Sequence, residues 1–297
     1  MELRHIKYFL ALAEERNFTK AAEKLCIAQP PLSRQIKDLE EELGTELFVR
    51  SPKGVTLTFA GEKFKEYALL MESLELQSKE ALMEMKNGLQ GTIYIATIEG
   101  KAPELLASWI AGFHKMYPNV DFNIWNGNSD DVAQRLRAGL CDIGLVMAPF
   151  NQEELKGTLV HKEPWVALMS TEHPLSFLPG ESVKLSELAG YDLIIPSKQS
   201  RLQEITGWFQ NINRKPHIVC RIAHIIDAYE LAKEQVGIAI YPAAAALYGD
   251  KSKVVAKRIE DPDVTAEYYV VKSGNRETTN VAAEFIGYIE GWKKTEK

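Results

Sequence analysis

The most informative segment of the chain is Gln29-Pro30-Pro31-Leu32-Ser33-Arg34-Gln35-Ile36-Lys37-Asp38-Leu39-Glu40-Glu41-Glu42-Leu43-Gly44. Prolines are tolerated in the first turn of a helix because the N–H groups there have no helical partner, and glycine commonly ends one. Leucine or isoleucine recurs at positions 32, 36, 39 and 43, which is the spacing of one buried helical stripe. The sequence therefore predicts a helix that begins at the prolines and ends at the glycine.

The face of this helix away from the stripe has a polar and basic first half and an acidic second half. Ser33, Arg34 and Lys37 lie in the first half, and acids occupy positions 38 and 40–42. The helix dipole and the free N–H groups of the first turn favour a phosphate at that end. We expect this end to enter a DNA major groove; the ordinary alternative is a helix exposed to solvent.

The flanking residues predict a helix-turn-helix followed by a wing. Residues 3–13 have helical spacing, Thr19 can cap a short helix over residues 20–25, and residues 26–28 form a tight connection. After the helix predicted over residues 29–44, two β-prone runs at residues 47–50 and 55–57 flank a Pro/Gly turn, which indicates a hairpin. Arg50 and Lys53 on it can reach the phosphate backbone or the minor groove, although either residue alone is typical of a solvated turn.

The same residues resemble the LysR-type transcriptional regulators. The matching motifs are Phe18-Thr19-x-Ala21-Ala22-x-x-Leu25, Gln29-Pro30-Pro31-Leu32-Ser33-x-x-Ile36-x-x-Leu39-Glu40-x-x-Leu43-Gly44, Leu47-Phe48-x-Arg50 and Leu57-Thr58-x-Ala60-Gly61. Ala28 departs from the pattern, since a serine commonly precedes the glutamine. The resemblance implies that double-stranded DNA is approached by Thr19, Gln29, Pro30, Ser33, Arg34 and Lys37, with Arg50 and Lys53 on the wing.

A long helix is expected next, over residues 59–86, with Thr58 as its cap. Positions three and four apart along it form a heptad seam of Phe64, Tyr67, Met71, Leu74, Ser78, Ala81 and Met85, which only the serine interrupts. The small head cannot bury such a stripe, so we expect two chains to pair through it; the alternative is packing on the chain's own C-terminal part. The resemblance also implies a homodimer through this helix and a homotetramer, and RNA polymerase is a further candidate partner.

From residue 91 onwards, strands alternate with helices in the pattern of βαβ units and a parallel sheet. Expected strands lie at residues 92–96, 120–125, 142–146, 164–169, 191–195, 216–221, 237–242 and 267–271, and a closing helix at 279–293. Two open α/β lobes bind a ligand between them, at strand C-termini and helix N-termini. The resemblance implies an effector-binding domain like a periplasmic binding protein.

The loops that follow the predicted strands supply the candidate effector-binding residues. Their hydroxyls and amides at helix starts suit a small polar or anionic ligand. Glu99 disfavours a simple carboxylate, whereas Lys101, Lys198 and Arg201 attract one; the alternative for each residue is a helix cap without a ligand, and for His224 a surface position. The candidates are Thr97, Glu99, Gly100, Lys101, Asn128, Ser129, Pro196, Ser197, Lys198 and His224.

The predicted fold class is therefore multidomain: an N-terminal winged helix-turn-helix with a long linker helix, then an α/β two-lobed domain like a periplasmic binding protein. Residues 1–58 form the DNA-binding head, residues 59–90 the linker helix and hinge, and residues 91–297 the effector-binding domain. We place lobe I at residues 91–162 and 266–297, and lobe II at residues 163–265.

Composition limits the remaining classes of protein. The 297 residues include 35 Lys+Arg and 41 Asp+Glu, so the net charge is −6 and argues against coating nucleic acid through bulk charge. The longest apolar run, near residues 236–247, is too short to span a membrane and contains a proline. Cys26, Cys141 and Cys220 lie far apart, which excludes a disulfide framework or a cysteine zinc site and favours the cytoplasm, with all three as small core residues.

Two other classes of protein compete with a regulator. An enzyme would need a catalytic group in the cleft, and no Ser-His-Asp order, phosphate loop, HExxH or dinucleotide fingerprint is present. Glu99 with His224 is the only candidate pair and a weak one, so we expect no catalytic residue, metal ligand or cofactor. A solute-binding protein would need export and would lack the head. The sequence is best explained as a sequence-specific DNA-binding regulator controlled by a small effector.

Overall fold

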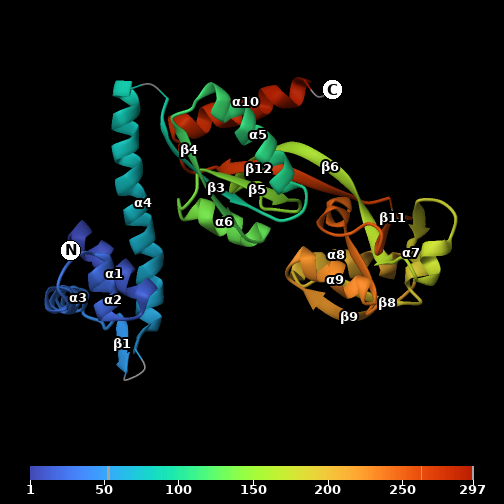
Figure 1. The fold of residues 1–297 in the computed structure, drawn as a ribbon, viewed down its shortest axis with the longest axis horizontal. Coiled ribbons are helices and arrows are strands. Elements are labelled where there is room, and N and C mark those ends of the chain that lie inside the picture. The colour runs from blue at the N-terminus through green and yellow to red at the C-terminus, as the bar shows by residue number, and fades with distance from the viewer. Residues whose placement is uncertain (52–53, 88, 262, 296–297) are drawn as a thin grey trace.

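A computed structural model describes residues 1–51, 54–87, 89–261 and 263–295, with side chains in these ranges except at positions 77, 80–87 and 293–295. Figure 1 shows a small N-terminal head, a long helix beside it, and a sheet-containing part that divides into two lobes. The predicted fold class, a winged helix-turn-helix with a linker helix and an α/β two-lobed domain, is confirmed.

The head packs around Phe9, whose ring centroid lies 5.1 Å from that of Phe48 and 4.8 Å from that of Phe64. The helix predicted to open at the two prolines begins at Gln29 and ends at Gly44, which adopts the left-handed conformation with φ 67°. The predicted helix-turn-helix and hairpin are therefore confirmed. The elements of the head are α1 (Leu3–Glu15), α2 (Phe18–Lys24), α3 (Gln29–Leu43), β1 (Phe48–Ser51) and β2 (Gly54–Leu57).

Three local predictions in the head are wrong. Leu43 is 38% exposed because it lies in the last turn of α3, where the helix extends past the core. The cap of α2 is Asn17 rather than Thr19, since the Asn17 Oδ1 atom accepts hydrogen bonds from the amides of Thr19 and Lys20. Cys26 is exposed, because the turn between α2 and α3 holds it at φ 55° and leaves its side chain outside the core.

The linker helix α4 (Phe59–Asn87) has the predicted span, and Thr58 is its cap: the hydroxyl of Thr58 accepts a hydrogen bond from the amide of Gly61 at 2.9 Å. Its first turns complete the core of the head, where Phe64, Ala68 and Met71 pack. The helix thus joins the head rigidly.

The predicted heptad seam of α4 divides into two faces. Phe64 and Met71 pack on the head, whereas Tyr67 and Leu74 are 57% and 58% exposed. Further along, the hydroxyl of Ser73 donates to the carbonyl of Gly139 at 3.0 Å, so α4 also contacts its own lobe I. The seam positions Ala81 and Met85 lie outside the described side chains.

The effector-binding part contains ten described strands in the order β4-β3-β5-β12-β6-β10-β8-β9, with β11 pairing with β6 and with β7. Strand β6 pairs with β12 along its first half and with β10 and β11 along its second half, so it runs through both lobes and joins them. The strands are β3 (Gly91–Thr97), β4 (Val120–Asn126), β5 (Ile143–Met147), β6 (Leu155–Ser170), β7 (Ser182–Lys184), β8 (Asp192–Pro196), β9 (His217–Ile222), β10 (Ile238–Pro242), β11 (Val254–Glu260) and β12 (Thr265–Ser273).

Helices alternate with the strands of this part as the sequence predicts, and the closing helix lies within a few residues of positions 279–293. The strand expected at residues 164–169 is only the second half of β6, and β7 and β11 were not predicted, because β7 is three residues long and β11 carries charged residues. The helices are α5 (Ala102–Met116), α6 (Ser129–Arg137), α7 (Leu185–Leu188), α8 (Gln199–Asn211), α9 (Ile225–Lys233) and α10 (Asn280–Thr295), with 3-10 helices η1 (Pro174–Phe177) and η2 (Ala243–Tyr248).

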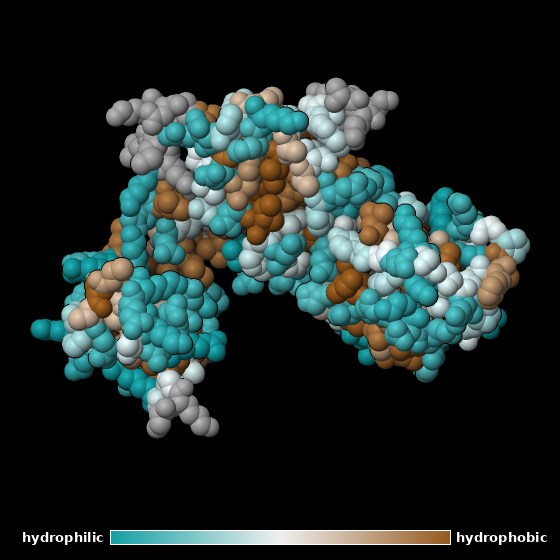
Figure 2. Space-filling view, in the orientation of Figure 1, coloured by the Kyte–Doolittle hydropathy of each residue, from teal (hydrophilic) through white to brown (hydrophobic). Residues whose placement is uncertain are grey.

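Figure 2 shows a mainly hydrophilic surface over the head and hydrophobic patches on both lobes. Among the described helices, none has the length and hydropathy that a membrane span requires. Of the two remaining cysteines, Cys141 is buried as expected, and burial raises the pKa of its thiol to about 12. Cys220 lies on β9 and is half-buried.

Candidate DNA-reading surface and interlobe cavity

Helix α3 presents a polar surface because its opposite face is fixed in the core. Leu32, Ile36 and Leu39 are fully buried. Outward from them, Gln29, Pro30, Arg34 and Lys37 are exposed and Ser33 is half-buried. The N-terminal half of α3 has no acid in its first turn, and its cap residue supplies no side-chain hydrogen bond. No acid therefore competes for an anion at that end, and because Pro30 and Pro31 have no N–H, the amide of Gln29 is the first-turn donor left for a DNA phosphate.

The wing is tied to α3 by one acid. Glu40 Oε1 accepts hydrogen bonds from the amides of Leu47 and Phe48, at 2.8 and 3.0 Å. Its other oxygen lies 3.6 Å from Arg50 Nη2, and the guanidinium of Arg50 stands 5.0 Å from the ring centroid of Phe18. Arg50 is therefore held beside α3 while remaining about half exposed.

The remaining predicted DNA-binding residues have different surroundings. Thr19 is exposed on α2, and Lys37 forms an ion pair with Glu41 one turn away, at 3.2 Å between exposed side chains. Such a pair contributes little to stability and can exchange for a phosphate contact. Lys53 lies outside the described residues.

A cavity of about 370 Å³ lies between the two lobes, within the size range of small-molecule sites. It brings together seven of the ten predicted effector residues, from four loops: Glu99, Gly100, Asn128, Ser129, Pro196, Lys198 and His224. Three others lie outside the lining. Thr97 is buried, Lys101 forms an ion pair with Glu104 at 2.6 Å, and Ser197 is an exposed residue whose amide pairs with the carbonyl of Ile222.

The apolar body of the cavity comes from strands rather than loops. Trp165, Tyr241 and Tyr268 line it from β6, β10 and β12. Among the described residues, the indole nitrogen of Trp165 and the hydroxyl of Tyr241 are buried without a hydrogen-bond partner. Sequence reasoning did not select these residues, because in a predicted buried strand an aromatic side chain is most simply explained as core.

Arg201 also lines the cavity and is buried. Its guanidinium donates to the carbonyls of Met147 and Ala148 in lobe I and pairs with Glu204 in its own helix. This side chain therefore joins the two lobes, and its charge is already paired.

Three helices begin at the cavity wall, and they differ in how their N-termini are capped. In α6, Asn128 accepts hydrogen bonds from the amides of Asp130 and Asp131. In α9, the capping carboxylate is Glu99 of the opposite lobe. In α8, no side chain among the described residues caps the first turn, which contains no acid. Lys198 precedes α8, and its ammonium lies 2.8 Å from Asp130 of lobe I.

The contact at α9 crosses the cavity. Glu99 Oε1 lies 3.0 Å from His224 Nδ1, and Oε2 accepts a hydrogen bond from the amide of Ile225 at 2.8 Å. The hydrogen bond and the negative charge of Glu99 raise the pKa of the His224 imidazole. This pair, the one arrangement that sequence reasoning weighed as catalytic, holds the lobes together.

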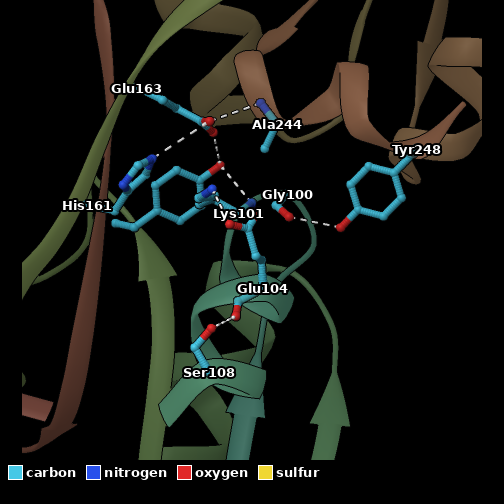
Figure 3. A network of polar contacts seen from close by, with 9 residues as sticks. Gly100, Lys101, Glu104, Ser108, His161, Glu163, Ala244 and Tyr248 are labelled. Carbon is cyan, nitrogen blue, oxygen red and sulfur yellow. Dashed lines mark hydrogen bonds and ion pairs between the residues drawn. The ribbon is translucent and has the colours of Figure 1, made fainter. Parts of the chain in front are cut away.

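A buried carboxylate lies where β6 passes between the lobes, and Figure 3 shows it. Glu163 Oε1 accepts a hydrogen bond from the Tyr268 hydroxyl at 2.7 Å, and Oε2 accepts one from the amide of Ala244 in lobe II at 2.9 Å. Burial raises the pKa of Glu163. Close by, the Tyr248 hydroxyl of lobe II donates to the carbonyl of Gly100 at 2.8 Å.

The described residues contain no cluster of three or more His, Cys, Asp or Glu side chains placed to hold a metal ion. The site consists instead of an exposed helix in the head and a cavity between lobes. Its chemistry is recognition: hydrogen-bond donors, one free helix N-terminus and an aromatic wall.

Comparisons with known proteins agree with this arrangement. Residues 3–62 match the family model described as the bacterial regulatory helix-turn-helix protein, lysR family, and residues 86–293 match the LysR substrate binding domain. The chain is 29% identical to the HTH-type transcriptional regulator BenM of Acinetobacter baylyi, over 95% of this chain and 93% of that protein. It is 30% identical to the Hca operon transcriptional activator HcaR of Escherichia coli, over 82% of each.

Solved structures show the same fold over the whole chain. Full-length CbnR, crystallised with its target DNA, matches with a TM-score of 0.79 at 24% identity, over 98% of this chain and 99% of CbnR. Full-length BenM matches with a TM-score of 0.60 at 28% identity, over 100% of this chain and 98% of BenM. Head, linker helix and two lobes thus occur in the same order in these proteins.

Proposed function

The chain belongs to the LysR family of bacterial transcriptional regulators, and from this premise we propose which residues read DNA and which class of effector controls it. The protein is a sequence-specific DNA-binding regulator, not an enzyme, and a small-molecule effector bound between its two α/β lobes controls its activity. The DNA contacts and the effector class are the parts that follow as proposals.

For DNA, we propose that the first half of α3 enters the major groove. Its exposure opposite a fully buried face supports this assignment, because a recognition helix must be both rigid and accessible. Arg34 has the side chain best suited to read a base edge, while the wing reaches the phosphates. The proposed contacts are Thr19, Gln29, Pro30, Ser33, Arg34, Lys37, Arg50 and Lys53.

For the effector, we propose a small anionic molecule with an apolar body, and its carboxylate or similar group lies at the start of α8. The observation that carries this proposal is the uncapped N-terminus of α8, preceded by Lys198 and facing an aromatic wall. Its free N–H groups and the ammonium are donors suited to one anionic group. Trp165 and Tyr268 then cover the apolar body.

Thermal unfolding of the full chain with hexanoate and benzoate tests this effector class, since a ligand that binds only the folded state raises the melting temperature. We expect stabilisation that saturates with concentration, and about tenfold weaker binding in Lys198→Ala. Lys215→Ala, which removes an exposed lysine away from the cavity, is the matched control. Equal affinities in the two variants would contradict the placement of the anion beside α8.

We further propose a homodimer through the exposed face of α4, where Tyr67 and Leu74 are 57% and 58% exposed. We also propose a homotetramer, a contact with RNA polymerase and a cytoplasmic location. The proposed domain boundaries are residue 58, between the head and the linker helix, and residue 90, between the linker helix and the effector-binding domain. Light scattering at micromolar concentration tests the assembly, and a strictly monomeric mass would contradict it. Substituting Tyr67 and Leu74 with serine is expected to weaken the dimer, whereas serine at exposed Phe177 of lobe II is not.

A further inference from the structure

One anion position in the cavity is already occupied by the protein itself. The N-terminus of α9 faces the cavity, and the carboxylate of Glu99 reaches it from the loop after β3 in the opposite lobe. Glu99 Oε2 lies 2.8 Å from the amide nitrogen of Ile225, the first residue of α9. A helix start of this kind ordinarily attracts an anionic ligand group, so Glu99 takes the place of one.

The loop that carries Glu99 is fixed on both sides. His224 Nδ1 lies 3.0 Å from Glu99 Oε1, and the next residue, Gly100, accepts a hydrogen bond from the Tyr248 hydroxyl at 2.8 Å. Gly100 has φ 87°, and a Cβ atom there would lie 2.7 Å from the Tyr268 hydroxyl, so only glycine fits this close approach. In this arrangement of the lobes the carboxylate is therefore part of the cavity wall.

The cavity thus has two unlike helix starts, which are neighbours because Pro196 at the end of β8 pairs with Ile222 at the end of β9. At the start of α8 there is a free helix N-terminus with Lys198, which pairs with Asp130 of lobe I, whereas the start of α9 is occupied by the carboxylate of Glu99, which pairs with His224. The hydroxyl of Tyr241 is buried, lines the cavity and has no hydrogen-bond partner among the described residues, and the charge of Glu99 contributes to raising its pKa. A ligand atom that reaches this region meets a hydroxyl and a carboxylate, which suit a neutral donor group rather than a second anion.

We propose that Glu99 is a specificity-determining residue that restricts the cavity to effectors with a single negatively charged group and a neutral group beside Glu99. This inference rests on the proposed anionic effector class. A molecule with two carboxylates would place the second one beside Glu99, and like charges a few ångströms apart in a partly enclosed site lower affinity by about tenfold or more.

Matched pairs of acids test the proposal on the full chain: hexanoate against adipate, and benzoate against terephthalate, each titrated by calorimetry. The wild type is expected to bind each monoacid at least about tenfold more tightly than its diacid. Glu99→Ser removes the carboxylate from the start of α9 and is expected to reduce the ratio of monoacid to diacid affinity to about one or to invert it. Glu99→Gln removes only the charge and is expected to reduce that ratio partly. Glu104→Gln is the matched control, because that acid contacts Lys101 outside the cavity lining.

The outcomes separate this inference from the effector class on which it rests. If the wild type binds diacids as tightly as monoacids, Glu99 does not set specificity, although the anionic effector class survives. If the ratio is unchanged in Glu99→Ser, the inference is overturned in the same way. If the wild type binds none of the four acids, the proposed effector class fails, and a second measurement decides the role of Glu99.

That second measurement uses sulfate and the amide of Ile225, observed by NMR after selective labelling of isoleucine with ¹⁵N. In Glu99→Ser, sulfate is expected to shift this amide resonance in a saturable manner, because the helix N-terminus is then open to an anion. In the wild type and in Glu104→Gln, the shift is expected to be absent over the same concentrations. An equal shift in all three proteins, or none in Glu99→Ser, would overturn the inference.

Discussion

The DNA-reading face of the head and the cavity between the lobes are built in opposite ways. The proposed reading residues lie within 35 positions of one another, between Thr19 and Lys53, and most are exposed. The polar residues of the cavity are instead paired across the lobes: Glu99 meets His224 from 125 positions away, and Lys198 meets Asp130. One surface is local and open, and the other is assembled from distant segments and already bonded to itself.

The two surfaces therefore bind their ligands in different ways. The core of the head fixes the backbone of α3, so the proposed DNA contacts require only side-chain exchanges, such as the release of Lys37 from Glu41. In the cavity, a ligand must compete with contacts that the lobes make with each other, so binding changes the set of bonds between them. A ligand can shift the arrangement of lobes only by the difference in its affinity for the two arrangements. The proposed DNA-reading surface is therefore in place before DNA binds, whereas a ligand in the cavity replaces bonds that already exist between the lobes.

The largest expected effect tests whether the head depends on a fixed core. Leu39→Ala removes a fully buried side chain of α3 and is expected to lower the free energy of unfolding by about 2–5 kcal/mol. Leu43→Ala, in the same helix but 38% exposed, is the matched control and is expected to cost less than about 1 kcal/mol. Denaturant unfolding of both variants gives the comparison; equal losses would mean that Leu43 packs in a core as well.

The next effect distinguishes base reading from phosphate contact. Arg34→Ala is expected to weaken binding to a selected operator by about 1–3 kcal/mol and to relax its sequence preference, because a side chain reading a base edge is lost. Lys53→Ala is expected to weaken binding to all sequences alike and to reduce the salt slope by about one unit. Titrations against operator and random DNA at several salt concentrations measure both. A uniform loss in Arg34→Ala would make that residue a phosphate contact.

A smaller effect is expected from the unpartnered hydroxyl in the cavity. Tyr241→Phe removes one buried hydroxyl and keeps the ring, so binding of 4-hydroxybenzoate, whose phenol lies opposite its carboxylate, is expected to weaken by about 0.5–1.5 kcal/mol because the phenol loses that hydrogen bond. Tyr229→Phe, whose hydroxyl is bonded to the carbonyl of Asp250 away from the cavity lining, is the matched control. Calorimetry on the variants measures the change, and an unaltered affinity in Tyr241→Phe would place the ligand elsewhere.

The contrast between the two surfaces also explains what the sequence could predict. The head follows from local signals: prolines that open α3, a glycine that ends it, and a stripe at helical spacing. Its errors are local too, since Asn17 and Thr19 are both capable caps and only the backbone decides between them. Leu43 fits the stripe by spacing, but the position of the helix end relative to the core is a tertiary property.

The sequence predicts only part of the cavity, because the loops can be located from the strand ends but the strand residues that form the walls cannot. Glu99, Asn128 and Lys198 stand at strand-to-helix junctions, which the βαβ pattern identifies. Trp165 and Tyr241 lie within strands, and whether such a residue faces a core or a cavity depends on how two lobes meet. The capping of α9 by Glu99 joins segments 126 positions apart, and no local pattern specifies it.

The smallest effect concerns Glu163, where the two lobes join. Burial is the main reason why the pKa of Glu163 is raised in the folded protein, and the charge of Glu104 raises it further. Hydrogen bonds from the Tyr268 hydroxyl and the Ala244 amide, and the charge of Lys101, act in the opposite direction. The Nε2 atom of His161 lies 3.9 Å from Glu163 Oε2. A carboxyl with a raised folded pKa binds more protons in the folded state than in the unfolded one. The free energy of unfolding therefore falls as pH rises from its unfolded pKa near 4.5, and the fall ends above the folded pKa.

Glu163→Gln imitates the protonated carboxyl and is expected to remove this fall, as measured by urea unfolding between pH 4 and pH 8 at constant ionic strength. Glu267→Gln on the neighbouring strand is the control of opposite sign, because hydrogen bonds from Lys162 and Tyr269 lower the pKa of Glu267. Its contribution is present at high pH and is lost as pH falls through the folded pKa. If the fall with rising pH persists in Glu163→Gln, the carboxyl is ionised at the joint, and the lobes meet around a charge rather than around a neutral hydrogen-bonded group.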